Sequence, residues 1–331
     1  MINITINGFG RIGRRVFRLL QEQTDIQVVA INDLANAKTL SHLLKYDSIH
    51  GIFNGNIDYD SNHIIVNGKS IALLNQINIE EINWKPFDVN IVIEATGKFK
   101  TLKELNHHIT NGASQVILSV PSTDDAIKTI VMGINDHILK GKETIVSNAS
   151  CTTNNAAPMI KVIDDLCGVK QAYITTVHSY TTDQSLHDQP HKDLRRARAA
   201  GQSIVPTTTG AAKALTKIFP NLSDVIGGCG IRVPVANGSL TDITFNVSRY
   251  VTVEEINNAF KKASETSYKR ILEYTNDPIV SIDIVGNRHS CIFDSQMTSV
   301  IGNMVKIIGW YDNETGYSSR IIDLINRLST N

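Results

Sequence analysis

Cysteines are scarce in this sequence, hydrophobic runs are short, and neither sign of charge is in excess. The four cysteines stand far apart without a Cys-x-x-Cys pair, which argues against a zinc site or a redox couple. Basic and acidic residues number 32 each, so composition gives no indication of a nucleic-acid partner. The apolar runs are too short to cross a membrane, and the N-terminus has no signal-peptide pattern. We therefore expect a cytoplasmic protein with reduced thiols, no membrane segment and no metal site.

The first half of the chain alternates short apolar runs with helix-like segments. Residues 2–6 (INITI) and 26–31 (IQVVAI) read as strands, and residues 11–23 between them have helical apolar spacing. Further apolar runs follow at NIVIEA, QVILSV, TIVMGI and TIVSNA. This alternation predicts an α/β fold whose N-terminal domain is of the Rossmann type, with a parallel sheet.

The second half has longer, alternating strand patterns. They are YITTVHS, IRVPV, SLTDITFNVSR, IVSIDIV and MVKIIGWYD, with a helical pattern at VEEINNAFKKASETSYKRIL. Alternation of this kind predicts an antiparallel sheet with one covered face, and so an α+β domain. We expect one domain over residues 1–149 and a second over 150–314, with a helix over 315–331 packing back on the first.

A glycine motif joins the first predicted strand to the first predicted helix. Gly8, Gly10 and Gly13 form Gly-x-Gly-x-x-Gly, and Asp33 ends the next strand about 20 residues later, as in dinucleotide-binding folds. Glycines let the backbone approach a pyrophosphate at the helix N-terminus, and the acid would repel a 2′-phosphate. The motif therefore favours NAD over NADP. The other interpretation is a tight strand–helix turn with a solvated aspartate.

Cys151 lies in the polar run SNASCTTNNAAP, at the predicted start of a helix. Lone cysteines are usually structural and prefer apolar neighbours. A thiolate at a helix N-terminus is stabilised by the helix dipole and unpaired amides, which lowers the thiol pKa. We interpret Cys151 as a nucleophile.

A thiol nucleophile needs a base, and His178 is the candidate. It ends a predicted strand and is followed by the hydroxyl cluster of TTVHSYTTDQ. A core or loop histidine is the other interpretation. Four other histidines read as surface residues: His107, His108, His187 and His191.

The segment from residue 190 to residue 215 combines arginines with a hydroxyl–glycine helix start. The arginines are those of the run LRRARA, and the helix start is PTTTG. This combination is typical of phosphate binding, although a solvated basic loop or a subunit contact has the same composition. Arg232 stands among apolar residues, where a guanidinium needs a carboxylate or phosphate partner.

Together these residues resemble phosphorylating glyceraldehyde-3-phosphate dehydrogenase. The matching segments are NGFGRIGR, HLLKYDSIHG, SNASCTTN, TTVHSYT, HKDLRRARAA, PTTTGAAKAL, IRVPVANGSL and WYDNETGYS. The resemblance implies NAD-dependent oxidation of glyceraldehyde 3-phosphate, with uptake of inorganic phosphate, to 1,3-bisphosphoglycerate. It implies Cys151 as the nucleophile, through a thiohemiacetal and a thioester, with His178 as its base. It also implies a cytoplasmic homotetramer.

The resemblance further implies contacts with phosphate and cofactor. The substrate-phosphate site would use Thr181 and Arg232. The attacking-phosphate site would use Ser150, Thr152, Thr209 and Gly210, with Arg196 or Arg198 nearby. The cofactor contacts would be Gly8, Gly10, Arg11, Ile12, Gly13, Asp33, Thr96, Gly97, Ser119 and Asn313.

The chain departs from the family pattern at four places, one of them Thr315, where many relatives have tryptophan. Asn155 replaces a second cysteine, Ile77-Asn78-Ile79 replaces Arg-Asp-Pro on the adenine side, and Gln189 stands where leucine is common. The alternative function is that of erythrose-4-phosphate dehydrogenase, a relative with the same thiol chemistry. That relative typically lacks the threonines present here as Thr181 and Thr207–Thr209, so glyceraldehyde 3-phosphate is favoured.

Overall fold

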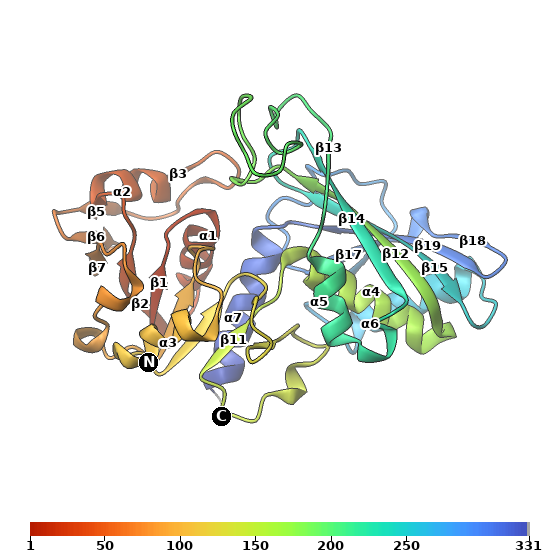
Figure 1. The fold of residues 1–331 in the computed structure, drawn as a ribbon, viewed down its shortest axis with the longest axis horizontal. Coiled ribbons are helices and arrows are strands. Elements are labelled where there is room, and N and C mark those ends of the chain that lie inside the picture. The colour runs from red at the N-terminus through yellow and green to blue at the C-terminus, as the bar shows by residue number, and fades with distance from the viewer. Residues whose placement is uncertain (330–331) are drawn as a thin grey trace. The chain divides into compact units, whose positions relative to one another are not determined.

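The computed structural model describes residues 1–329, which divide into two compact units (Figure 1). The first unit comprises Met1–Ile130, His137–Ala149 and the C-terminal segment from Ser318. The second comprises Val131–Asp136 and Ser150–Tyr317. The C-terminal helix α7 (Thr315–Ser329) begins in the second unit and continues in the first. Residues 330 and 331 of the helix expected over 315–331 lie outside the described residues.

The first unit is built on a mainly parallel sheet, which confirms the Rossmann-type prediction. The order of its strands among the described residues is β10 (Lys128–Thr129), β11 (Ile145–Ser147), β9 (Gln115–Leu118), β8 (Ile91–Glu94), β1 (Ile2–Asn7), β2 (Ile26–Asn32), β7 (Lys69–Leu74), β6 (His63–Val66) and β5 (Ile57–Tyr59). The edge strands β5 and β6 run antiparallel to their neighbours. A hairpin of β3 (Tyr46–Asp47) and β4 (Gly51–Ile52) lies outside this sheet.

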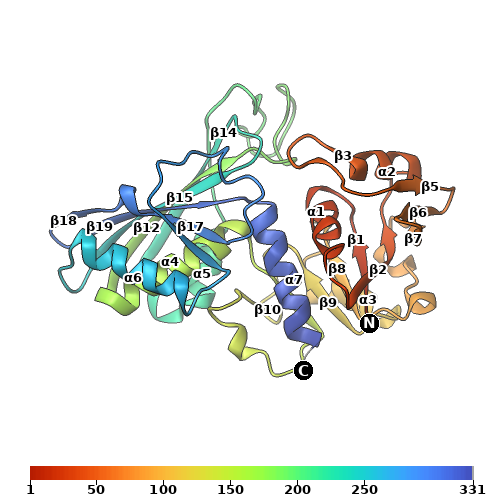
Figure 2. The ribbon, with the colours of Figure 1, turned by 180° about the vertical axis from the view of Figure 1, so that it is seen from behind.

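Helices pack on both faces of this sheet (Figure 2). They are α1 (Arg11–Leu20), α2 (Ala37–Lys45) and α3 (Leu102–Thr110), with short 3-10 helices η1 (Ile79–Glu81), η2 (Lys85–Phe87) and η3 (Asp136–Ile138). A Cβ at Gly13 of α1 would lie 3.1 Å from the Ile6 side chain, so α1 covers the Ile6 face. Leu105 of α3 joins the buried cluster of Trp84 and Val92. Val92 pairs with Thr5, so the two side chains lie on the same face of the sheet. Thr5 and Ile6 are successive and face opposite ways, so α3 covers the face opposite α1.

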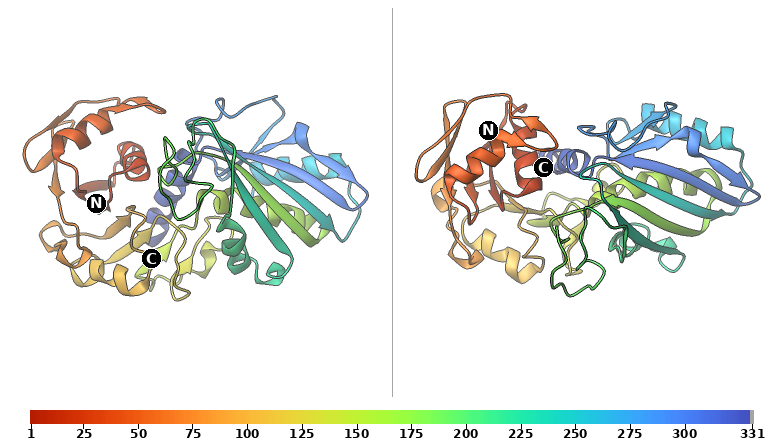
Figure 3. Two further views of the ribbon diagram at one scale, coloured as in Figure 1. Left: turned by 45° about the horizontal axis from the view of Figure 1, so that its top comes forward. Right: turned by 90° about the horizontal axis from the view of Figure 1, so that it is seen from above.

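The second unit is a mostly antiparallel sheet with helices on one face, as predicted (Figure 3). Its strand order among the described residues is β13 (Val205–Thr207), β14 (Ile226–Val233), β12 (Val169–Ser179), β15 (Ser239–Val247), β19 (Met304–Tyr311), β17 (Cys291–Asp294) and β16 (Leu272–Thr275), with β18 (Ser299–Ile301) paired to β19. Its helices are α4 (Cys151–Cys167), α5 (Ala211–Ile218) and α6 (Val253–Glu265), with 3-10 helices η4 (Pro220–Leu222) and η5 (Ser295–Met297). β12 and β14 are parallel because the crossover that contains α5 joins them.

Two local predictions in this unit were wrong. Residues 279–285 (IVSIDIV) form turns instead of a strand, with Val280 and Ile282 exposed and turn bonds such as Asp283 N to Val280 O. Pro278 precedes this run, and the run pairs with none of the strands among the described residues. The helical pattern at 253–272 ends at Glu265, and its last residue opens β16.

Candidate functional sites in the two units

A cavity of about 270 Å³ opens at the carboxyl ends of β1, β2 and β8 in the first unit. In an open parallel sheet this is the edge where ligands bind. Among the cofactor contacts implied by the family, Gly8, Gly10, Asp33 and Thr96 line the cavity. The structure therefore brings the glycine turn together with Asp33, the acid expected to bind ribose.

The glycines of the turn are required by close backbone approach. Gly8 has φ +93°, and a Cβ there would lie 2.7 Å from the Thr96 nitrogen. A Cβ at Gly13 would lie 2.3 Å from the Gly8 oxygen. At Gly10, which caps α1, a Cβ would meet no atom within 4 Å, so the backbone there is open to a ligand. These residues fit a pyrophosphate held at a helix N-terminus.

The other implied cofactor residues of the first unit do not line the cavity. Arg11 binds Asp47 through Nη1 at 2.7 Å and Nη2 at 3.1 Å. Ile12 follows it in α1, and Gly97 has φ +68° in the turn after β8. Ser119 is buried at the end of β9, where its N–H donates to the Glu94 oxygen.

Sequence reasoning missed several residues that line the cavity. Asn7 and Asn32 are buried at the ends of β1 and β2, and Ile77 on the adenine side is exposed. Polar residues at the carboxyl ends of neighbouring parallel strands were the available signal. Ile77 stands in the place where the chain departs from the family pattern.

The second unit holds the thiol. Cys151 is the first residue of α4, and Ser150 caps this helix by accepting from the Thr153 N–H at 3.1 Å. Cys151 Sγ lies 3.4 Å from His178 Nε2. The structure therefore brings together the two residues that sequence reasoning assigned to nucleophile and base.

Burial dominates the electrostatics of this thiol. It raises the pKa of Cys151, while the positive charge of Arg232 and hydrogen bonds from Thr152 lower it. The net direction is upward, in contrast to the lowered pKa expected at a helix N-terminus. Cys151 is only partly exposed, although the polar residues around it in the sequence suggest an open position.

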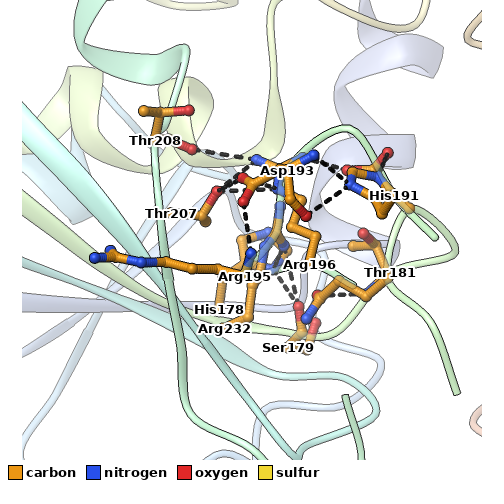
Figure 4. Close-up of polar contacts among 12 residues, drawn as sticks. His178, Ser179, Thr181, His191, Asp193, Arg195, Arg196, Thr207, Thr208 and Arg232 are labelled. Carbon is orange, nitrogen blue, oxygen red and sulfur yellow. Dashed lines mark hydrogen bonds and ion pairs between the residues drawn. The ribbon is translucent and has the colours of Figure 1, made fainter. Parts of the chain in front are cut away.

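His178 is buried near the end of β12, and its Nδ1 has two neighbours. Nδ1 lies 2.7 Å from the Ser179 oxygen and 2.5 Å from Arg232 Nη1 (Figure 4). Burial and the charge of Arg232 lower the pKa of His178 to about 3, although the Ser179 carbonyl acts in the opposite direction. The imidazole is therefore neutral at physiological pH.

Arg196 and Arg232 belong to one charged cluster, whereas Arg198 lies apart. Arg196 donates to Thr207 Oγ1 from Nε at 2.9 Å and contacts Asp183 (Figure 4). The charge of Arg196 also lowers the pKa of Arg232. Arg198 instead pairs with Asp188 at 3.0 Å on the surface. The sequence left open whether Arg196 or Arg198 lies near the attacking-phosphate site, and the geometry favours Arg196.

The remaining implied phosphate contacts are held by local hydrogen bonds. Thr152 is buried with its hydroxyl 2.9 Å from Tyr311 Oη. Thr209 Oγ1 accepts from the Ala211 N–H at 3.2 Å, and Gly210 caps α5. The N–H of Thr181, just after β12, donates to Gln184 Oε1 at 3.3 Å.

Asn313, the implied nicotinamide contact, is fixed by two serines. Its Oδ1 accepts from Ser179 Oγ at 2.9 Å and from Ser239 Oγ at 3.0 Å. The departure Asn155 is buried in α4 and donates to the Trp310 oxygen at 3.2 Å. It thus links α4 to β19.

Within residues 1–329, no three histidine, cysteine, aspartate or glutamate side chains gather as metal ligands. No helix in the same range is long and apolar enough to cross a membrane.

A dinucleotide cavity in one unit and a thiol beside a neutral imidazole in the other define a dehydrogenase that uses a cysteine. Comparison with known proteins identifies its family. The NAD-binding domain model of glyceraldehyde 3-phosphate dehydrogenase matches residues 2–102, and the C-terminal domain model matches residues 150–313. The chain therefore belongs to the glyceraldehyde-3-phosphate dehydrogenase family, and its cofactor is NAD.

Curated relatives match along the full length. Glyceraldehyde-3-phosphate dehydrogenase 2 of Streptomyces avermitilis is 51% identical over 326 residues, which cover 98% of this chain and 97% of the relative. Glyceraldehyde-3-phosphate dehydrogenase 1 of Bacillus cereus is 48% identical with the same coverage. The Streptomyces coelicolor protein is 50% identical over 327 residues, again covering 98% and 97%.

Proposed function

We propose that this chain oxidises and phosphorylates D-glyceraldehyde 3-phosphate to 1,3-bisphosphoglycerate through a covalent intermediate on Cys151. The distance of 3.4 Å between Cys151 Sγ and His178 Nε2 is the observation that carries the proposal. At this distance the imidazole can take the thiol proton, and the thiolate can attack the aldehyde carbon. The carbonyl oxygen takes the proton back from the imidazole to give a thiohemiacetal.

His178 then acts as the base for the thiohemiacetal hydroxyl. For this its Nε2 must be unprotonated, so Nδ1 carries the proton and donates it to the Ser179 oxygen at 2.7 Å. Arg232 Nη1, a donor only, competes for the same Nδ1 at 2.5 Å. A substrate phosphate that binds Arg232 would remove this competition and leave Nε2 as the basic nitrogen.

The chemistry that NAD supplies when bound is acceptance of a hydride from the thiohemiacetal carbon. The chain's residues would hold the cofactor at the glycine turn of Gly8 and Gly10, with Asp33 toward the adenosine ribose. Asn313, fixed by Ser179 and Ser239, would orient the carboxamide. Inorganic phosphate then attacks the thioester carbon, and the acyl phosphate leaves as the C–S bond breaks and the thiol is regenerated.

Two anion sites follow from the same proposal. Thr181 and Arg232 would bind the substrate phosphate. Ser150, Thr209 and Gly210, with Arg196, would bind the attacking phosphate, since hydroxyls, backbone N–H groups and a guanidinium suit that ion. Thr152 would act on this site through the backbone, because its hydroxyl is held by Tyr311.

The experiment is an assay of NAD reduction with glyceraldehyde 3-phosphate and with erythrose 4-phosphate, each with and without inorganic phosphate. We expect phosphate-dependent turnover of glyceraldehyde 3-phosphate. Replacing His178 with Gln should lower kcat by about 10²–10⁴-fold, the usual contribution of a general base. Phosphate-independent oxidation of erythrose 4-phosphate as the faster reaction would contradict the assignment.

We also propose that the chain is a cytoplasmic homotetramer. The sheet face opposite α4–α6 supports assembly, because it exposes Tyr173 and Met304 beside a cavity of about 590 Å³. Sedimentation velocity tests the oligomer. A Tyr173→Arg variant should sediment as a smaller species, and a wild-type monomer would contradict the proposal.

A further inference from the structure

Glu94 is a fully buried carboxylate in the middle of the NAD-binding sheet, and the proposed chemistry does not use it. It ends β8, which lies between β1 and β9. We propose that Glu94 is a positioning residue that fixes two walls of the NAD cavity relative to each other.

Both oxygens of Glu94 accept hydrogen bonds from cavity residues. Oε1 accepts from the Thr96 N–H at 2.9 Å and from the Thr96 hydroxyl. Oε2 accepts from Asn7 Nδ2 at 2.6 Å and lies 3.1 Å from His108 Nε2. Four donors fill the acceptor sites of one carboxylate, so neither oxygen is left without a hydrogen-bond partner.

His108 is a neutral donor in this network. Trp84 Nε1 lies 3.0 Å from His108 Nδ1. An indole nitrogen only donates, so Nδ1 must accept and the imidazole proton lies on Nε2, directed at Glu94. Sequence reasoning placed His108 on the surface, but it is fully buried, on the same face of α3 as Leu105. Glu94 is therefore held by neutral donors from both the core and the cavity.

The network reaches the cofactor turn through two contacts. Asn7 and Thr96 both line the cavity. Asn7 Oδ1 accepts from Asn32 Nδ2 at 2.8 Å on one wall. On the other wall, the Thr96 nitrogen lies where a Cβ of Gly8 would be only 2.7 Å away. A shift of Thr96 therefore moves the glycine turn that approaches the pyrophosphate.

A carboxamide of the same size cannot replace this carboxylate. In Glu94→Gln, the NH₂ group faces either the Thr96 N–H, which can only donate, or the donors of Asn7 and His108. Each orientation sets donors against donors, and a buried unpaired donor is costly. The side chains must move apart, and the cavity walls move with them.

Titration calorimetry with NAD tests the proposal. Glu94→Gln should raise the Kd for NAD by about tenfold or more, the loss expected for one hydrogen bond to a charged group. The KM for NAD should rise in parallel, with a smaller change in kcat at saturating NAD, a split that a general loss of stability would not produce. Glu104→Gln is the matched control, since Glu104 caps α3 in the same unit without lining the cavity. It should lower the thermal midpoint and leave the Kd for NAD unchanged.

Two variants of His108 keep the test decisive if Glu94→Gln does not fold. His108→Gln retains an N–H that can reach Glu94, whereas His108→Leu has none. We expect His108→Leu to raise the Kd for NAD by several-fold, roughly the value of one hydrogen bond, and His108→Gln by less. A folded Glu94→Gln chain with an unchanged Kd for NAD would overturn the proposal. Should that variant fail to fold, an unchanged Kd in His108→Leu would overturn it.

Discussion

Arg232 and His178 face each other on neighbouring parallel strands, and Arg232 Nη1 lies 2.5 Å from His178 Nδ1. A donor so close to Nδ1 competes with the donation of Nδ1 to the Ser179 oxygen. The proton on the imidazole is thereby linked to the position of Arg232, which we propose binds the substrate phosphate. Binding of a phosphate ester and the basicity of His178 are expected to change together.

Removal of this arginine should raise the pKa of His178. Burial and the charge of Arg232 together lower that pKa from an ordinary 6.5 to about 3. In Arg232→Met the charge is gone while burial remains, so the pKa should rise but stay below 6.5. Titration of the His178 ring proton by NMR measures the shift. Arg249→Met, which removes a surface arginine paired with Glu255, is the control, and an unchanged His178 pKa in Arg232→Met would contradict the geometry.

The Arg232→Met substitution should also change the pKa of the Cys151 thiol. Burial raises the pKa of this thiol and the positive charge of Arg232 lowers it, because a cation favours the thiolate. Arg232→Met should therefore move the pH midpoint of Cys151 alkylation upward. The rate of iodoacetamide labelling against pH, followed on the Cys151 peptide, measures this. A midpoint that moves downward would show that Arg232 does not stabilise the thiolate.

Gly8 is expected to tolerate no side chain. Its φ of +93° opposes alanine, and so does the Thr96 nitrogen, which would lie only 2.7 Å from the new Cβ. Gly8→Ala should cost about 1–3 kcal/mol of stability from backbone strain and abolish measurable NAD binding. Urea unfolding and calorimetry with NAD test the two effects. Gly68→Ala, at another positive φ but with no atom within 4 Å of the Cβ, should lose stability without losing NAD binding.

Asp47 should contribute stability that depends on pH. Burial would raise its pKa, but the N–H groups of His50 and Ile49 and the Arg11 guanidinium outweigh burial and hold the pKa at about 2. A carboxyl whose pKa is lowered in the folded state stabilises the fold at pH values above 3.8, its ordinary pKa. This stabilisation is lost as the pH falls toward 2. Asp47→Asn should therefore lower the free energy of unfolding by about 2 kcal/mol at neutral pH.

Urea unfolding of Asp47→Asn at pH 7 and near pH 2 checks this. The difference from wild type should shrink to less than about 0.5 kcal/mol at the lower pH. Asp165→Asn, which breaks an exposed pair with Lys161, should cost less than about 0.5 kcal/mol at either pH. Equal losses from the two variants at pH 7 would contradict the account.

Local patterns in the sequence predicted much of the fold and the glycine turn. The strand, turn and helix around Gly8 and Gly10 depend on neighbours in the chain, so spacing alone specifies them. His108 shows the limit, because its helical spacing from Leu105 marks a buried face while its polarity argued for the surface. The run at 279–285 has strand alternation, but hydrogen-bonded pairing decides a strand, and the run pairs with no strand of the described residues.

The electrostatics of the thiol site could not be predicted in the same way. Cys151 and His178 were named by their residue types and flanking sequence. Their separation depends on how α4 packs beneath β12, and the position of Arg232 depends on the pairing of β12 with β14. Burial of the thiol, which reverses the expected direction of its pKa, is likewise a property of the whole second unit.

The most direct test of the central claim is mass spectrometry of the chain after mixing with NAD and glyceraldehyde 3-phosphate in the absence of inorganic phosphate, with acid quenching. We expect one phosphoglyceroyl group on Cys151, lost when inorganic phosphate is added and absent from Cys151→Ser. NAD reduction with no acyl group on Cys151, or retained turnover in Cys151→Ser, would contradict the account.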